Sequence, residues 1–213
     1  VCYARHTQEL SVDLNDQGRV KKVLKGVEPD IVIHCAGLVD VDRCEQNPKL
    51  AYESNIEATE NILSVCVEST KFVYISTDQV YGECSNRSES NKQLSPVNIY
   101  GATKYRTEQM VLSKQTDSIV VRTNIFGWNV KPGKSSSAEE IFFALRSKKE
   151  LTLFDDYFSS PIYSLCLGKV LISLLSRGFS GILNVGSSAM CSKYEFGMEM
   201  ARLMGYGSST IRR

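Results

Sequence analysis

Short apolar segments alternate with longer segments of helical periodicity along this chain of 213 residues. Segments 31–33 and 72–75 are apolar on both faces, as a strand in the middle of a parallel sheet requires. Parallel strands need a crossover connection, which is usually a helix. The alternation therefore predicts an α/β fold with a doubly wound parallel sheet.

Seven segments are expected to form strands, and six are expected to form helices. The strands are 1–4, 10–13, 30–36, 71–77, 118–123, 151–154 and 181–185. The helices are 17–27, 49–68, 98–114, 137–148, 163–177 and 192–205, and Pro48 suits the start of the second one. The polar segment 82–96 predicts a surface loop. A second loop, 128–137, is expected to divide the chain into a sheet domain, 1–128, and a smaller part, 129–213. Some elements of the smaller part are expected to return to the sheet.

Composition excludes several classes of protein. The formal charge is +1, so no broad field favours nucleic acid or an acidic membrane as a partner. No apolar segment approaches the roughly 18 to 20 residues of a spanning helix. Seven scattered cysteines without Cys-x-x-Cys spacing indicate reduced thiols, which predicts a cytoplasmic protein. Asp40, Asp42 and Glu45 are expected to form a polar loop, so no metal site is predicted.

Tyr100 and Lys104 form a Tyr-x-x-x-Lys pair after the strand that ends in Ser76 and Thr77. Residues four apart lie on one face of a helix, one turn apart. A nearby cation favours the ionised phenol and lowers its pKa. One of the two strand-end hydroxyls could then hold a carbonyl oxygen while Tyr100 supplies a proton. The alternative is that these hydroxyls only cap the backbone.

The order of these motifs resembles the extended short-chain dehydrogenase/reductase family, which acts on nucleotide-sugars. The matching segments are Val12–Leu14, Pro29–Gly37, Asn55, Ile75–Gly82, Tyr100–Lys104 and Val121–Gly127. Within that family the chain is most similar to the dTDP-4-dehydrorhamnose reductases of dTDP-rhamnose biosynthesis, through segments 153–161, 181–186 and 193–196. The resemblance implies a Rossmann-like sheet in which 1–128 binds a dinucleotide and 129–213 binds substrate.

The resemblance also implies a role for each residue of the motif. Tyr100 would be the proton donor, and Lys104 would lower the Tyr100 pKa and hydrogen-bond the nicotinamide ribose. Thr77 would hold the carbonyl oxygen, with Ser76 as the alternative. Gln79 stands where the related 4,6-dehydratases place a glutamate, and an amide is no general base, so carbonyl reduction is favoured over dehydration.

Further residues are implied to contact the dinucleotide. Asp13 and Leu14 match the turn at the adenine, although Asp13 could instead cap the next helix. Asn55 would support the site through the backbone. The small residues after the strand at 30–36 would let the cofactor approach closely, and Thr123 and Ile125 would flank the nicotinamide. The full set expected to bind cofactor is Arg5, Asp13, Leu14, Ala36, Gly37, Leu38, Asn55, Ser76, Tyr100, Lys104, Thr123 and Ile125.

Arg5 bears on the choice of dinucleotide. A basic residue at this strand end accommodates the 2′-phosphate of NADP, whereas an acidic one favours NAD. The sequence therefore favours NADP, with NAD as the alternative. No Gly-x-x-Gly-x-x-Gly turn occurs near residue 1, so we expect that turn and its strand to lie upstream of this chain.

The predicted activity is NADPH-dependent reduction of a 4-keto-6-deoxy nucleotide-sugar. The region after Trp128, with Lys131, Lys134 and the loop 154–161, is expected to hold the nucleotide. Two alternatives stay open: an epimerase, which consumes no net NADPH, and a non-catalytic dinucleotide-binding subunit of a partner enzyme. A homodimer, if one forms, would pair the helices 49–68 and 98–114.

Overall fold

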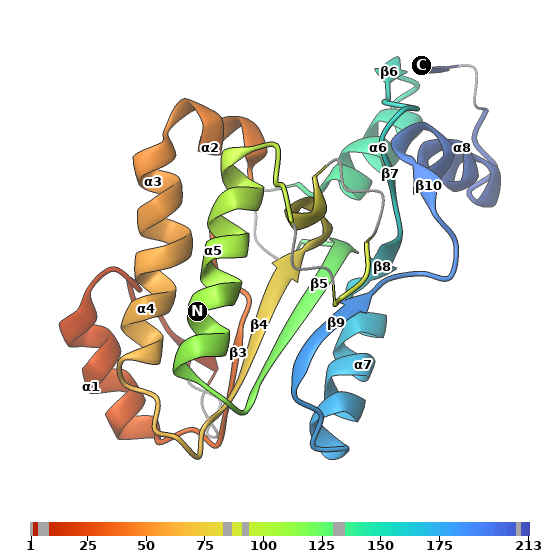
Figure 1. The fold of residues 1–213 in the computed structure, drawn as a ribbon. Coiled ribbons are helices and arrows are strands. Elements are labelled where there is room, and N and C mark those ends of the chain that lie inside the picture. Colours follow the sequence, from red (N-terminus) through yellow and green to blue (C-terminus); the bar gives the residue numbers. More distant parts are fainter. Residues whose placement is uncertain (1, 4–8, 83–86, 91–93, 130–134, 208–209) are drawn as a thin grey trace. The chain divides into compact units, whose positions relative to one another are not determined.

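The computed structural model describes residues 2–3, 9–82, 87–90, 94–129, 135–207 and 210–213. These divide into two compact units (Figure 1). The first unit is Val1–Arg122 with Phe179–Asn184, and the second is Thr123–Gly178 with Val185–Arg213. Arg5, Lys131 and Lys134, which the sequence singled out, lie outside the described residues.

The first unit is built on a sheet in which β3, β4 and β5 are neighbours in that order, and β9 pairs with β5. The strands are β3 (Ile31–His34), β4 (Lys71–Thr77), β5 (Ser118–Phe126) and β9 (Gly181–Val185). β3 and β4 run parallel, with Ile31 opposite Lys71 and His34 opposite Tyr74. β4 is buried along nearly its whole length, as its apolar sequence predicted.

Helical elements cover this sheet (Figure 1). They are α1 (Gln17–Val27), α2 (Val41–Gln46), α3 (Pro48–Tyr52), the π-helix η1 (Glu53–Glu57), α4 (Ala58–Leu63), the 3-10 helix η2 (Asp78–Tyr81) and α5 (Ile99–Lys114). α5 lies beside the α3–η1–α4 segment, and it also packs on β4. The core between them contains Val20, Ile62, Leu63, Phe72, Tyr74, Val111 and Val120.

The second unit contains the end of β5, which pairs in parallel with β8 (Pro161–Tyr163). Two small sheets accompany it: β6 (Leu151–Thr152) is parallel to β11 (Ile211–Arg212), and β7 (Phe158–Ser159) is antiparallel to β10 (Cys191–Ser192). Its helices are α6 (Ser137–Arg146), α7 (Ser164–Ser176) and α8 (Lys193–Leu203). Ile141, Leu145, Leu153, Ala201 and Ile211 form its core.

Three expectations about the elements are wrong. The described residues of segments 1–4 and 10–13 do not join the parallel sheet. β1 (Cys2–Tyr3) instead pairs antiparallel with β2 (Glu9–Leu10), because two strands so close in sequence cannot be joined by a parallel crossover. The helix predicted over 49–68 is interrupted by a π-helix and ends at Leu63. The segment around Asp40 is the helix α2, which Asp40 caps by accepting from the Arg43 N–H at 3.0 Å.

Candidate active site

The first turn of α5 is held against the segment that follows β4. The Asn98 side chain caps α5 by accepting from the Gly101 N–H at 2.7 Å, and its amide donates to Gln79 Oε1 at 2.8 Å. A Cβ at Gly101 would lie 2.8 Å from the Gln79 carbonyl oxygen, so glycine is required for this close approach. The contact brings the helix that carries Tyr100 up to the end of the strand that carries Thr77.

Lys104 points at the carboxyl end of β4. Its ammonium donates to the Ile75 carbonyl at 2.7 Å and lies over the Tyr74 ring, 4.1 Å from the centroid. Burial lowers the pKa of Lys104 to about 8, while the negative charge of Glu108 acts in the opposite direction. Tyr100 is buried in a cluster with Cys44 and Ala51.

The two strand-end hydroxyls have different surroundings. Ser76 Oγ donates to the buried Glu108 carboxylate at 2.5 Å, so its hydroxyl proton is already used in a hydrogen bond within the fold. Thr77 Oγ1 accepts from the Gln79 N–H at 3.2 Å and contacts Asp78 Oδ1 at 3.4 Å. Thr77 Oγ1 thus caps the 3-10 helix η2, which is the backbone-capping alternative given above, and the choice of Thr77 over Ser76 stays a prediction.

Asn55 connects the turn after β3 to α5. Its side-chain oxygen accepts from the Leu38 N–H at 2.7 Å, and its amide donates to the Leu38 carbonyl at 3.1 Å and to Thr103 Oγ1 at 2.9 Å. A Cβ at Gly37 would lie 2.7 Å from Asn55 Oδ1, which explains the glycine there. Asn55 therefore fixes the Ala36–Leu38 turn by direct hydrogen bonds.

The π-helix η1 is tied down by hydroxyl groups. The Asn55 carbonyl accepts from Thr59 Oγ1 at 2.8 Å and from Thr107 Oγ1 at 3.1 Å, so a helix far along the chain shares this carbonyl. π-bulges occur frequently at functional sites. The position of Asn55 thus depends on a tertiary contact that helical periodicity does not show.

His34 is a packed residue of the sheet, as the sequence indicated. Its Nε2 lies 2.9 Å from Thr59 Oγ1, and its ring lies near those of Phe72 and Tyr74. Burial, with a smaller effect of Lys104, lowers the pKa of His34 to about 3. The imidazole is therefore neutral at neutral pH and adds no charge beside Lys104.

The residues expected at the adenine lie in the turn before α1. Asp13 does not cap this helix: its carboxylate accepts from the Asn15 N–H at 3.0 Å, whereas Asp16 caps α1 by accepting from the Arg19 N–H. The Asp13 side chain is exposed, and Leu14 packs against the core of the first unit. The exposed Asp13 leaves the adenine assignment as a prediction.

A buried ion pair was not among the sequence predictions. Glu108 and Arg122 are both fully buried, with Arg122 Nη2 donating to Glu108 Oε2 at 2.7 Å and Nε to Oε1 at 3.1 Å. The available signal was the position of Glu108, four residues after Lys104 on one helix face. Its partner on β5 could not be identified from spacing.

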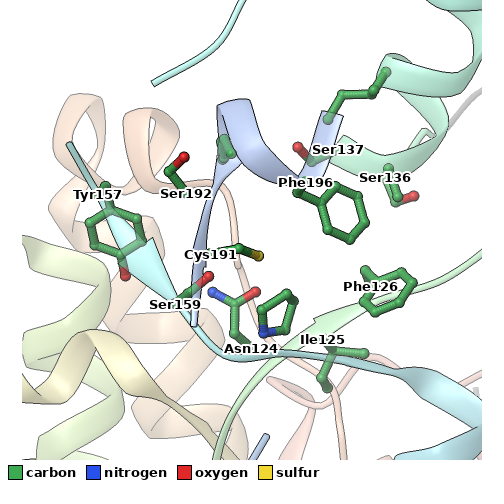
Figure 2. Close-up of a pocket in the computed structure, with 14 residues that line it drawn as sticks. Asn124, Ile125, Phe126, Ser136, Ser137, Tyr157, Ser159, Cys191, Ser192 and Phe196 are labelled. Atoms are coloured by element: carbon green, nitrogen blue, oxygen red, sulfur yellow. The ribbon is translucent and has the colours of Figure 1, made fainter. Parts of the chain in front are cut away.

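The second unit contains a pocket of its own, shown in Figure 2. Phe126 and Phe196 stack edge to face at 5.1 Å on one side of it, and Tyr157 stands on the other. Ile125 lines this pocket, while the Thr123 hydroxyl is buried without a hydrogen-bond partner among the described residues. The other lining residues are Asn124, Ser136, Ser137, Ala138, Ile141, Ser159, Pro161, Cys191, Ser192 and Lys193.

Two capped helix N-termini open onto this pocket. Ser136 caps α6 and Ser192 caps α8, each in a reciprocal capping box with a glutamate. Glu139 accepts from the Ser136 N–H at 2.6 Å and from Asn129, and these hydrogen bonds lower its pKa to about 2. The region after Trp128 and the loop 154–161, which were expected to hold the nucleotide, both contribute residues to this pocket. Its lining comes from four separate segments, and the segment 191–196 was not among those expected.

The first unit can be tested for its fit to a dinucleotide. Ala36 and Gly37 are exposed small residues at the carboxyl end of β3, where α/β sheets bind ligands. The Lys104 ammonium lies at the carboxyl end of the neighbouring strand. Both features suit the close approach of a nucleotide backbone and ribose. Among the described residues, no cluster of His, Cys, Asp or Glu could hold a metal ion, and no helix is long and apolar enough to cross a membrane.

Comparison with known proteins adds independent findings. Residues 2–212 match the family model described as the RmlD substrate binding domain. The chain is 32% identical to the spore coat polysaccharide biosynthesis protein SpsK of Bacillus subtilis (strain 168), covering 94% of this chain and 75% of that protein. It is 27% identical to methionine adenosyltransferase 2 subunit beta of Xenopus laevis, covering 94% of this chain and 62% of that protein.

A solved structure is similar over nearly the whole chain. It is the dTDP-4-dehydrorhamnose reductase of Bacillus anthracis str. Ames in complex with NADP, with a TM-score of 0.85 and 26% identity. The match covers 94% of this chain and 71% of that one. The predicted α/β fold of Rossmann type is thereby confirmed.

Proposed function

The chain belongs to the family of the RmlD substrate binding domain, and from this premise we propose that it takes part in NADPH-dependent reduction of a 4-keto-6-deoxy nucleotide-sugar. It is an oxidoreductase of the extended short-chain dehydrogenase/reductase type. The observation that carries the proposal is the placement of Lys104, whose buried ammonium reaches the carboxyl end of β4 beside Thr77. The NADP complex of the similar reductase supports the choice of cofactor.

Three side chains of the first unit would act on the keto group. Thr77 would hold the carbonyl oxygen by a hydrogen bond, and Tyr100 would protonate that oxygen. Lys104 would favour the ionised phenol by its charge and would hold the nicotinamide ribose. When bound, NADPH supplies the hydride. Ala36, Gly37 and Leu38, fixed by Asn55, would line its approach.

The pocket of the second unit would bind the nucleotide part of the substrate. Its aromatic side chains, Phe126, Tyr157 and Phe196, suit the flat faces of a base or sugar. Lys193 suits an anionic diphosphate, whereas the N-terminal ends of α6 and α8 already hold the carboxylates of their capping boxes. This assignment rests on chemical complementarity within that unit.

The Tyr100→Phe substitution tests the chemistry. It removes only the phenolic oxygen, so we expect turnover of the keto-sugar to fall by a factor on the order of 100 to 10,000 while cofactor affinity is unchanged. NADPH oxidation measures turnover, and a fluorescence titration measures the affinity for NADPH. Tyr105→Phe, on the same helix, is the matched control. Retained activity in Tyr100→Phe would remove the mechanism, and a net NADPH consumption of zero would indicate epimerisation instead.

A second candidate function is favoured by one relative. The similarity to a protein named as the beta subunit of methionine adenosyltransferase 2 supports the alternative that this chain is a subunit of a partner enzyme. The presence of Thr77, Tyr100 and Lys104 together argues for catalysis. Assay of purified protein with a keto-sugar and NADPH separates the two: NADPH binding and a stable partner enzyme, with no turnover, would favour the subunit.

A further inference from the structure

Glu108 is a carboxylate without access to solvent, one helical turn beyond Lys104. It accepts from Ser76 Oγ at 2.5 Å and from two nitrogens of Arg122. A buried carboxylate is costly unless it is paired and hydrogen-bonded, and here both oxygens are used. Glu108 lies on α5, Ser76 on β4 and Arg122 on β5, so this carboxylate joins the elements that surround the strand terminus.

Arg122 extends the connection to the other side of Thr77. Its Nη1 donates to the Tyr81 hydroxyl at 3.0 Å, and Tyr81 donates to Asn184 Oδ1 at 2.8 Å. Ser76 precedes Thr77 directly, and Tyr81 ends the 3-10 helix that follows it. The network therefore holds the segment that carries Thr77 at both of its ends.

Glu108 also affects the charge of Lys104. The groups that interact with Lys104 are Tyr74 on β4, His34 on β3, Cys35 directly after β3, and Glu108 on its own helix. His34 is neutral at neutral pH, and burial raises the pKa of the Cys35 thiol, which keeps it neutral as well. Glu108 is thus the carboxylate that favours the ammonium form of Lys104 against the effect of burial.

We propose that Glu108 is a positioning residue for the reduction: it fixes the Ser76–Thr77 strand end through Ser76 and Arg122, and it keeps Lys104 in its ammonium form. Glu108 contacts neither substrate nor cofactor and acts through these neighbours. The inference rests on the proposed function only for the roles of Thr77 and Lys104.

The test is Glu108→Gln, which keeps the shape of the side chain and removes its charge. The pKa of Lys104 is followed by NMR titration of isotope-labelled lysine, with the signal assigned by Lys104→Arg. We expect the Lys104 pKa to fall below that of the wild-type protein, because the negative charge that opposes the effect of burial is gone. The alkaline limb of the plot of kcat against pH should move to lower pH by as much as the Lys104 pKa falls. Lowering the pH should therefore restore the activity of Glu108→Gln. Glu60→Gln, which breaks the exposed ion pair with Lys114, is the control. It should change neither the Lys104 pKa nor the pH dependence of kcat.

An unchanged Lys104 pKa in a folded Glu108→Gln protein would overturn the proposal. The NMR titration needs no turnover, so this outcome is distinct from failure of the proposed function, which would appear as an inactive wild-type protein. If Glu108→Gln does not fold, Ser76→Ala gives the answer, because it removes one partner and leaves the ion pair intact. We then expect kcat to fall several-fold at constant KM, and an unchanged kcat would contradict the positioning role.

Discussion

The end of β4 in the first unit and the pocket of the second unit differ in how their polar groups are held. Around β4, the polar groups of Ser76, Glu108 and Arg122 are buried and bonded to one another, and the buried Lys104 ammonium donates to the Ile75 carbonyl. The pocket instead combines aromatic side chains with capped helix ends, and Lys193 is exposed there. Proton transfer requires fixed hydroxyls and a defined charge, which burial provides. Binding an anion requires accessible donors, which a rigid but open lining provides.

The largest expected effect concerns the stability of the buried network. Arg122→Met leaves Glu108 buried without its cation, which should lower the free energy of unfolding by about 3–5 kcal/mol. Urea unfolding followed by circular dichroism measures this. In the second unit, Arg202→Met breaks the exposed pair with Glu199 and should cost less than about 1 kcal/mol. Equal losses in the two variants would show that burial does not distinguish the pairs.

The next effect concerns the two strand-end hydroxyls. Thr77→Val removes the proposed hydrogen bond to the carbonyl oxygen, so kcat should fall by a factor on the order of 100 to 1,000. Ser76→Ala should cost less, because Ser76 Oγ is committed to Glu108 and would act only by positioning. Steady-state kinetics of both variants, with unfolding curves as the control for stability, decides between them. A larger loss in Ser76→Ala would reverse the assignment.

The smallest effect concerns the pocket of the second unit. Lys193→Ala removes a cation at the proposed diphosphate position. KM for the nucleotide-sugar should therefore rise roughly tenfold or less, with kcat unchanged. This corresponds to a loss of about 1 kcal/mol of binding that is equal in the ground state and the transition state. Lys169→Ala is the matched control, because Lys169 is an exposed lysine of α7 that does not line the pocket. An unchanged KM would remove the pocket from the substrate site.

Much of the first unit could be predicted because its motifs are local. β4 begins and ends where the apolar segment 71–77 does, and the Tyr-x-x-x-Lys spacing was enough to place Tyr100 and Lys104 on one helix. The helix α2 was missed although Asp40 is a good cap, because its short sequence carries little apolar periodicity. The π-helix at Asn55 was missed because it depends on hydroxyls of Thr59 and Thr107, one of them from another helix.

The sequence by itself determined the α/β alternation, the bounds of β4 and β9, and the placement of Tyr100 and Lys104 on one helix, because these depend on local periodicity and on fixed spacing within one helix. Only the tertiary structure decided the pairing of Glu108 with Arg122, the hydrogen bond from Ser76 to Glu108, and the pocket that Phe126 and Phe196 line. Those features join segments far apart along the chain. Their energies come from burial and hydrogen bonding that exist only once the elements are packed.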